Sequence, residues 1–160
     1  MPAKATKGNI TTGHVGLNVT NLEKSKDFYG AAFGLEVMTE VDADDRRFAF
    51  LTDGRRLVLS LWEQSVGRFD AALPGLHHLA FEVESVEKVR ETEARIRKLG
   101  APLLYDGIVA HSDGAASGGI FFEDPDGTRL EVYSLDAGKG HRAPSGGAPS
   151  CGMTDILKCT

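Results

Sequence analysis

The sequence predicts an α+β fold made of two βαβββ modules in a pseudo-twofold arrangement that forms a cupped mixed sheet. The first observation is a repeat, because HVGLNVTNLEKS (14–25) and HLAFEVESVEKV (78–89) are nearly the same sequence. The second is that each copy begins with the apolar alternation of a strand and continues with the apolar spacing of a helix. The third is that three strand-like stretches follow each copy. A repeated unit of this size buries its apolar faces by pairing with its copy.

The first module is expected at residues 11–70. Alternating apolar residues predict a strand over about 11–19, and NLEKSKDFYGAAF predicts a helix between an Asn21 N-cap and a Gly34 C-cap. Polar turns separate the three strands that follow. These strands are expected at about 35–41, 46–52 and 56–63.

The second module is expected at residues 74–136. It begins with a strand over about 77–84 and continues with a helix over 85–99 that ends at Gly100. The turn DPDG precedes the last strand and has Pro and Gly where a tight turn favours them. The remaining strands are expected at about 103–108, 118–123 and 128–135.

Two tails are expected outside the modules, at residues 1–10 and 137–160. The second is rich in Gly, Pro and Ala, a composition that buries too little apolar surface to offset the entropy of ordering. It carries both cysteines of the chain, Cys151 and Cys159, which are too few for a structural zinc site or a disulfide framework. Both are expected to be reduced.

The composition indicates a soluble, cytoplasmic protein. Hydrophobic residues make up 41% of the chain and charged residues 26%, and no apolar run approaches the roughly 20 residues of a membrane span. The N-terminal stretch lacks the apolar segment of a secretory signal. The formal net charge is −5, and no basic run is interleaved with aromatic residues. Nucleic acid and membranes are therefore not expected as partners.

A histidine opens each copy of the repeat, at His14 and His78. Side chains alternate along a strand, so each histidine shares its face with a very small residue two positions on, Gly16 or Ala80. A lone strand histidine is ordinarily a hydrogen-bonded structural residue. Two at equivalent positions, each beside a gap, are expected to meet near the pseudo-twofold axis. The neighbouring His77 is expected to point away from this site and to be structural.

A carboxylate on the last predicted strand is the third candidate ligand. Glu131 is flanked by apolar residues, an environment in which an unpaired carboxylate is costly. It is either a rim residue paired with Arg129 or the residue that completes a site with His14 and His78. Two imidazoles and one carboxylate on facing strands form a divalent-metal site with open positions.

The chain resembles members of the vicinal oxygen chelate superfamily, which includes glyoxalases, fosfomycin-resistance proteins and extradiol dioxygenases. The likeness covers about residues 11–135 and is carried by HVGLNVTNLEKSKDFYGAAFGLEV, by GLHHLAFEVESVEKV with RKLGA, and by FFEDPDGTRLEVYS. The resemblance implies paired βαβββ modules that cup a metal. The ligands it implies come from the first and last strands of the modules, which here means His14, His78 and Glu131.

Departures from the subfamily patterns narrow the expected reaction. Glyoxalase I and similar lyases take a fourth ligand from the last strand of the first module, where residues 58–60 read VLS and Glu63 just beyond is expected to face solvent. Fosfomycin-type thiol transferases commonly have threonine where this chain has Gly16. Extradiol dioxygenases have a tyrosine acid near the position of Phe121 and are usually twice as long. The match to each subfamily is therefore partial.

Five further residues are candidates for the site. His111 or Tyr133 would act as a general acid or base, since an imidazole pKa near about 6.5 suits proton transfer. A solvent-facing loop position explains His111 equally well. Arg129, Trp62 and Phe121 are candidates for substrate contacts, although Arg129 and Tyr133 also suit the orientation of Glu131, and Trp62 also suits the core.

The sequence thus predicts a metal-dependent enzyme that chelates two neighbouring oxygens of a small substrate, with dioxygenase-like oxygen insertion as the leading reaction. Fe(II) is the favoured cation, with Mn(II), Ni(II) or Zn(II) as alternatives. Metal-assisted epimerisation and thiol transfer to an epoxide are the other reactions that fit. A ligand-sequestering protein of the bleomycin-resistance kind, which needs no metal, is the alternative from another class. A homodimer is expected, with modules paired within one chain or swapped between chains.

Overall fold

The computed structural model describes residues 11–145 and contains two modules of the same design. The first contains β1 (Val15–Val19), α1 (Leu22–Phe33), β2 (Glu36–Ala43), β3 (Arg46–Thr52) and β4 (Leu57–Glu63). The second contains β5 (Leu79–Glu82), α2 (Val86–Leu99), β6 (Val109–Ala110), β7 (Gly118–Glu123) and β8 (Arg129–Ser134). Each module forms its own four-stranded sheet, ordered β1-β4-β3-β2 and β5-β8-β7-β6. The predicted α+β fold with two βαβββ modules is confirmed.

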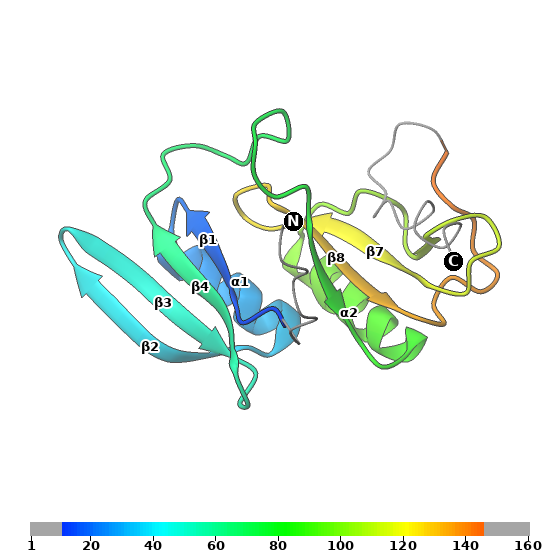
Figure 1. Cartoon of the computed structure of the whole chain (residues 1–160), viewed down its shortest axis with the longest axis horizontal. Helices are drawn as coiled ribbons and strands as arrows, with labels where there is room; N and C mark the ends of the chain where they lie inside the picture. The colour runs from blue at the N-terminus through cyan, green and yellow to red at the C-terminus, as the bar shows by residue number, and fades with distance from the viewer. Residues whose placement is uncertain (1–10, 146–160) are drawn as a thin grey trace, which may run out of the picture.

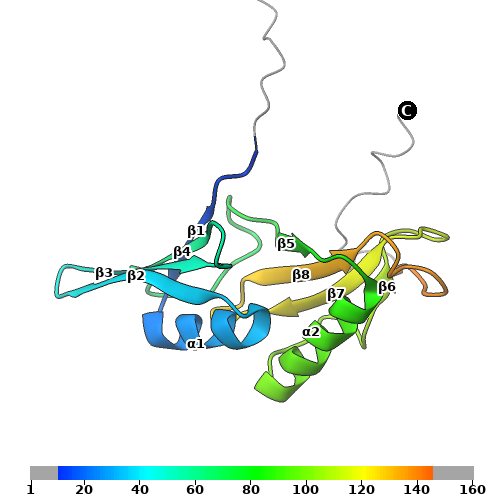
Figure 2. The ribbon, with the colours of Figure 1, turned by 90° about the horizontal axis from the view of Figure 1, so that it is seen from below.

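The two sheets lie side by side, and both helices pack on the same side of them (Figure 1). The view turned by 90° shows α1 beneath the first sheet and α2 beneath the second (Figure 2). We call the side of the sheets without helices the open face. Gly16 and Asn18 of β1 and Ala80 and Glu82 of β5 alternate with the core-facing residues of their strands and are exposed there.

Strand pairing is the same in both modules. β1 pairs in parallel with β4, and β5 pairs in parallel with β8. The other neighbours are antiparallel. Two parallel strands require a crossover, and the helix with the strands after it supplies one in each module. Equivalent positions of the sequence repeat therefore occupy equivalent positions in the two sheets.

The helices begin and end where the sequence signals. Asn21 accepts a hydrogen bond on Oδ1 from the N–H of Lys24 (2.9 Å) and caps α1. Gly34 ends this helix with φ 70°, and its N–H donates to the carbonyl of Gly30 (2.8 Å). Gly100 ends α2 in the same left-handed conformation, with φ 69°. A residue with a Cβ atom would be strained at either position.

Apolar side chains of both modules form one core on the helix side of the sheets. Phe33 of α1 packs against Phe81 of β5, with ring centroids 4.5 Å apart, and against Phe122 of β7 at 6.2 Å. The first helix therefore packs against the second sheet as well as its own. The fully buried members of this core are Val19, Leu22, Tyr29, Ala32, Ala49, Leu59, Leu61, Val89, Ile96, Ile120, Phe122, Leu130 and Val132.

Two aspartates of the turn at 124–127 bond the second module to the first. Asp124, only 3% exposed, accepts a hydrogen bond from the Tyr29 hydroxyl (2.8 Å). Asp126 accepts one from the N–H of Thr20 (2.9 Å) and another from its hydroxyl. Burial raises the pKa of Asp124 despite these bonds, and burial together with the Asp124 charge raises the pKa of Tyr29 well above its usual value. We call the Tyr29–Asp124 and Thr20–Asp126 contacts the module-joining bonds.

One predicted strand is wrong. Residues 103–108 form a bend, with a single bridge from Leu103 to β7, and β6 is only two residues long. Pro102 has no N–H to donate, and Gly107 turns the chain with φ 94°. The segment therefore pairs with β7 only at its start, where the N–H of Glu123 donates to the carbonyl of Pro102 (3.0 Å) and the N–H of Leu104 donates to that of Phe121 (2.8 Å).

Contacts continue beyond residue 136. Ala137 is 1% exposed, and the N–H of Gly138 donates to the carbonyl of Ala116 (2.7 Å). The start of the predicted C-terminal tail thus packs on the second module. The predicted N-terminal tail and both cysteines lie outside the described residues. Within residues 11–145, no helix has the length and apolar character needed to cross a bilayer.

Candidate functional site

Glu131 lies in the middle of β8, with its side chain on the open face of the second sheet. Its neighbours Leu130 and Val132 are fully buried on the helix side, so strand alternation directs Glu131 the other way. Even so, Glu131 is only 1% exposed. A carboxylate this deeply buried needs bonding partners, because burial without them is costly.

Two histidines, one to each carboxylate oxygen, supply those partners. His78 Nε2 lies 3.2 Å from Glu131 Oε2, and His111 Nε2 lies 2.6 Å from Oε1. The second ring nitrogen of His111 contacts the Ser117 hydroxyl at 3.0 Å. His78 immediately precedes β5, and parallel pairing sets Ala80 beside Glu131. The parallel pairing of β5 with β8 therefore brings His78 to the carboxylate.

The histidines control the charge of this carboxylate. Burial raises the pKa of Glu131, but the hydrogen bonds from His111 and His78 and the interaction with their charge outweigh burial and hold the pKa below its ordinary value. Glu131 is therefore ionised at neutral pH. The alternative pairing with Arg129 is not the one that the structure forms.

Aromatic side chains surround the carboxylate. Phe121, 3% exposed, is the cross-strand partner of Glu131 on β7, and the Tyr105 ring packs edge-on against it at 5.6 Å. Tyr133 lies on the same face of β8, its ring 5.4 Å from that of His111, and its hydroxyl donates to Glu82 (2.8 Å). The carboxylate of Glu131 thus lies beside an apolar wall formed by Phe121 and Tyr105, with the polar side chains of Tyr133 and Glu82 on the same face of the sheet.

The predicted residues Arg129 and Trp62 lie in different sheets. Arg129 begins β8 on the same face as Glu131, and its charge acts to lower the pKa of Tyr105, which burial raises more strongly. Trp62 belongs to the first sheet, where its ring stacks on Phe48 at 4.6 Å. A single chain therefore does not bring Trp62 to the carboxylate.

His14 is also separate from this cluster. It is exposed and lines a cavity of about 220 Å³ between the facing edges of the two sheets, together with Ala80 but without His78 or Glu131. Among residues 11–145, no three His, Cys, Asp or Glu side chains are arranged to hold a metal ion within one chain. His78 and Glu131 still suit a divalent cation by type, because they are an imidazole and an ionised carboxylate on adjacent strands.

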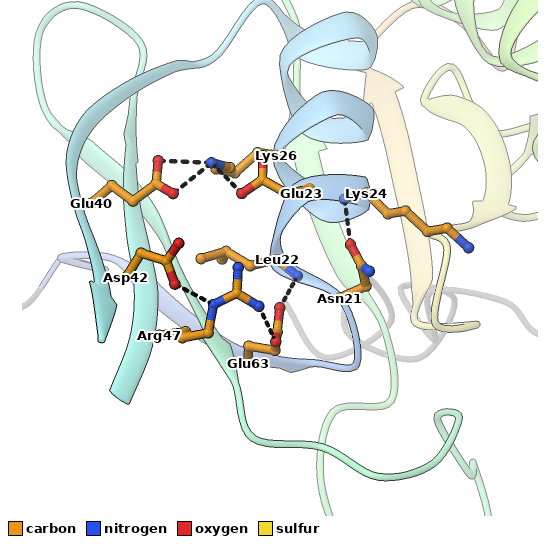
Figure 3. A network of polar contacts seen from close by, with 9 residues as sticks. All are labelled: Asn21, Leu22, Glu23, Lys24, Lys26, Glu40, Asp42, Arg47 and Glu63. Carbon is orange, nitrogen blue, oxygen red and sulfur yellow. Dashed lines mark hydrogen bonds and ion pairs between the residues drawn. The ribbon is translucent and has the colours of Figure 1, made fainter. Parts of the chain in front are cut away.

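Glu63 does not face solvent as expected. It ends β4 with its side chain 21% exposed, and its Oε2 accepts a hydrogen bond from the N–H of Leu22 (2.6 Å) at the start of α1 (Figure 3). Its other oxygen pairs with Arg47, which also bonds Asp42 (2.6 Å). The carboxylate stabilises the helix N-terminus and is not directed to the site.

Sequence reasoning missed the roles of Ser117 and His77. Ser117 follows a run of small residues whose pattern indicates only a loop. His77 does not point away from His78, because their Nδ1 atoms lie 2.8 Å apart. The only signal for this contact was the doublet of adjacent histidines before β5.

Comparisons with known proteins agree with this architecture. The model of the Glyoxalase/Bleomycin resistance protein/Dioxygenase superfamily matches residues 11–132. A trivalent organoarsenical cleaving enzyme of Bacillus sp. (strain MD1) is 34% identical over 120 residues, which cover 75% of this chain and 70% of that enzyme. Lactoylglutathione lyase of Neisseria meningitidis is 31% identical over 137 residues, covering 78% and 91%. Catechol-2,3-dioxygenase of Bacillus subtilis is 28% identical over 124 residues, covering 76% of this chain but 40% of that enzyme.

Solved structures show the same fold. A glyoxylase/bleomycin resistance protein/dioxygenase domain from Frankia sp. EAN1pec superposes with a TM-score of 0.65 at 25% identity, covering 84% of this chain and 96% of that one. The fosfomycin resistance protein FosX of Listeria monocytogenes, solved with Mn(II), gives a TM-score of 0.60 at 22% identity, covering 79% and 93%. The likeness to FosX is one of fold.

Proposed function

The chain belongs to the glyoxalase/bleomycin resistance protein/dioxygenase superfamily, and from that premise we propose that it is a metal-dependent enzyme with dioxygenase-like chemistry. The observation that carries the proposal is the buried carboxylate of Glu131 between His78 and His111. Fe(II) is the cation we favour, with Mn(II), Ni(II) or Zn(II) as alternatives. When bound, such a cation acts as a Lewis acid toward two neighbouring oxygens of a small substrate.

His78 and Glu131 would hold the cation from one chain, and we assign the third ligand to His14 of the partner subunit in a homodimer. Within one chain, the module-joining bonds and the packing of Phe33 on Phe81 fix the two sheets side by side. Folding one sheet over the other would break these buried contacts. A second copy can instead place its first sheet over the open face, and twofold symmetry then builds two equivalent sites.

The open face of the first sheet offers an apolar surface for this pairing. Phe48, Phe50 and Trp62 are half-buried and form a cluster, with Phe48 5.1 Å from Phe50 and 4.6 Å from Trp62 between ring centroids. In the proposed dimer, this cluster faces the site of the other chain. Trp62 would then contact substrate, which is one of the two roles that its sequence position suggested.

The remaining site residues have separate tasks in this proposal. His111 contacts the carboxylate through Nε2, and in this proposal it accepts or donates a proton beside it. Tyr133 is the second acid–base group, and Glu82 holds its hydroxyl. Phe121 covers the carboxylate with an apolar ring that excludes water, and Arg129 binds negative charge on the substrate.

Anaerobic reconstitution tests the proposed reaction. We expect the metal-free protein to take up one Fe(II) per chain, and the loaded protein to consume O₂ when a catechol is added. A chelator should abolish this consumption. Lactoylglutathione and a trivalent organoarsenical, which the names of two relatives suggest, complete the substrate panel. Turnover of either without O₂ uptake would replace the dioxygenase assignment, and a protein that binds ligands but no metal would contradict the enzyme assignment.

Subunit complementation tests the shared site. We expect His14→Ala and Glu131→Gln to lose the bound metal separately. Random mixing of the two variants makes half of the dimers mixed, and one of the two sites in each is intact, so about one quarter of the wild-type metal content should return. No recovery after unfolding and refolding the mixture would show that His14 and Glu131 do not meet across subunits. Refolded wild type is the control for losses in the procedure.

A further inference from the structure

Adjacent histidines before β5 make a direct ring contact. His77 Nδ1 and His78 Nδ1 lie 2.8 Å apart, with the ring planes at 79°. Neighbouring side chains in a strand point to opposite faces, but β5 begins only at Leu79. Both rings can therefore turn toward each other. His77 is exposed, whereas the side chain of His78 is 17% exposed.

This contact links the proton on Nδ1 of His78 to the proton on its Nε2. Two ring nitrogens at 2.8 Å form a hydrogen bond only when one carries the proton and the other offers its lone pair. A neutral imidazole has one N–H, so the proton on Nδ1 and the proton on Nε2 exclude each other. The state of Nδ1, which faces His77, therefore decides whether Nε2 carries a proton that it donates to Glu131 or a lone pair that can bind a cation.

Two proton arrangements satisfy the contact between His77 and His78, and only the first of them also gives Glu131 a hydrogen bond. In the first, His77 donates from Nδ1 to His78 Nδ1, and His78 donates from Nε2 to Glu131 Oε2, at 3.2 Å. In the second, His78 donates from Nδ1 to His77, and its Nε2 lone pair is free to bind a cation. Both arrangements keep both rings neutral. In the second, the single proton of His77 is on Nε2.

We propose that His77 is a positioning residue that stabilises the Nδ1–H tautomer of His78 required for metal binding. This inference rests on the proposed function, because it concerns the ligand role of His78. His77 suits the task because its ring can both donate to and accept from His78, and because its exposure allows its own proton to exchange with water. Outer hydrogen-bond partners of metal-bound histidines fix the ring and raise its basicity.

His111 cannot perform this task. It contacts the other oxygen of Glu131, at 2.6 Å, and its second nitrogen contacts Ser117. Its two ring nitrogens are thus occupied by Glu131 and Ser117. The partner of His78 Nδ1 is supplied by the preceding residue of the chain.

Three variants of the full chain test the proposal, with Zn(II) as the probe. His77→Phe keeps a ring but has no group to accept a proton, and we expect it to weaken Zn(II) affinity about 10- to 100-fold. His77→Asn places an amide oxygen where it accepts from His78 Nδ1, and its affinity should stay within a few-fold of wild type. His141→Phe removes another exposed histidine and should bind Zn(II) as wild type does. Equal affinity for wild type and His77→Phe, or no rescue by His77→Asn, would overturn the inference.

Ring-nitrogen NMR separates this inference from the proposed function. In ¹⁵N-labelled protein, we expect a coupling across the hydrogen bond between the Nδ1 atoms of His77 and His78, with and without Zn(II). The bridging proton should belong to His77 in the metal-free protein and to His78 after Zn(II) is added. Absence of the coupling in the metal-free protein overturns the role of His77. If the coupling is present but Zn(II) does not bind, the ligand role of His78 fails together with the proposed function.

Discussion

Replacing Glu131 with glutamine is expected to lower metal affinity by more than about 100-fold. Loss of an outer hydrogen-bond partner of a metal ligand lowers affinity by about 10- to 100-fold, and loss of the ligand itself should lower it further. The glutamine keeps the shape of the side chain but removes the charge that His78 and His111 stabilise. Turnover should fall with the bound metal. Isothermal titration with Zn(II), together with metal analysis of the purified protein, measures the loss.

A matched variant separates this effect from a change of net charge. Glu87→Gln alters an exposed glutamate of α2, on the helix side of the sheets, and should leave metal binding unchanged. Glu131→Gln should remain folded, with a free energy of unfolding within about 2 kcal/mol of wild type, because the amide keeps the shape of the side chain and an oxygen that accepts a hydrogen bond from one of the histidines. A folded Glu131→Gln variant with full metal content would remove Glu131 from the site.

Replacing Asp124 with alanine is expected to lower the free energy of unfolding by about 3 to 5 kcal/mol, because several buried donors lose their acceptor at once. The carboxylate accepts from the Tyr29 hydroxyl (2.8 Å) and from the N–H groups of Asp126 (2.9 Å) and Thr128 (2.8 Å). The substitution thus weakens both the turn and the contact between modules. Urea unfolding of the metal-free protein measures the change.

Asp53→Ala is the control for this experiment. Asp53 also accepts two backbone N–H groups, from Arg55 and Arg56 (both 2.9 Å), but in an exposed turn. Its replacement should shift the urea midpoint far less. Equal shifts for Asp53→Ala and Asp124→Ala would mean that burial at the module boundary contributes nothing.

The raised pKa of Asp124 gives this site a pH signature. The folded protein holds the proton of Asp124 more tightly than the unfolded chain, whose aspartate titrates near 3.8. The stability of wild type relative to Asp124→Asn should therefore be greatest below that value, fall as the pH rises through the raised folded pKa, and stay constant above it. The same urea midpoints, measured from pH 3 upward for both proteins, check the direction.

The repeat in the sequence was sufficient to predict most of the fold. Alternation identified the first and last strands of both modules, and Gly34 and Gly100 ended the helices as expected. The strand predicted at 103–108 failed because its apolar residues pack without a regular ladder. The spacing of apolar residues indicates which side chains are buried, but it does not indicate whether the backbone N–H and C=O groups form hydrogen bonds with a neighbouring strand.

The site could be predicted only in part. The sequence identified His78 and Glu131 as candidates on the first and last strands of the second module, and they meet because β5 and β8 pair in parallel with Ala80 beside Glu131. His111 reaches the carboxylate from an irregular segment, so no spacing in the sequence determines its distance from Glu131. The position of His14 depends on how the modules pack, and that depends on side-chain contacts such as Phe33 with Phe81. A pattern of strands and helices does not contain this information.

The module-joining bonds do not involve residues 70–77 of the peptide that connects the two halves. Residues 70–77, between the two halves, are all exposed, whereas the module-joining bonds run from α1 and the end of β1 to the turn before β8. Exposed connections tolerate changes of length. Insertions and deletions between the halves should therefore accumulate during evolution without altering the architecture, and two copies of an ancestral gene could have been fused through almost any short peptide.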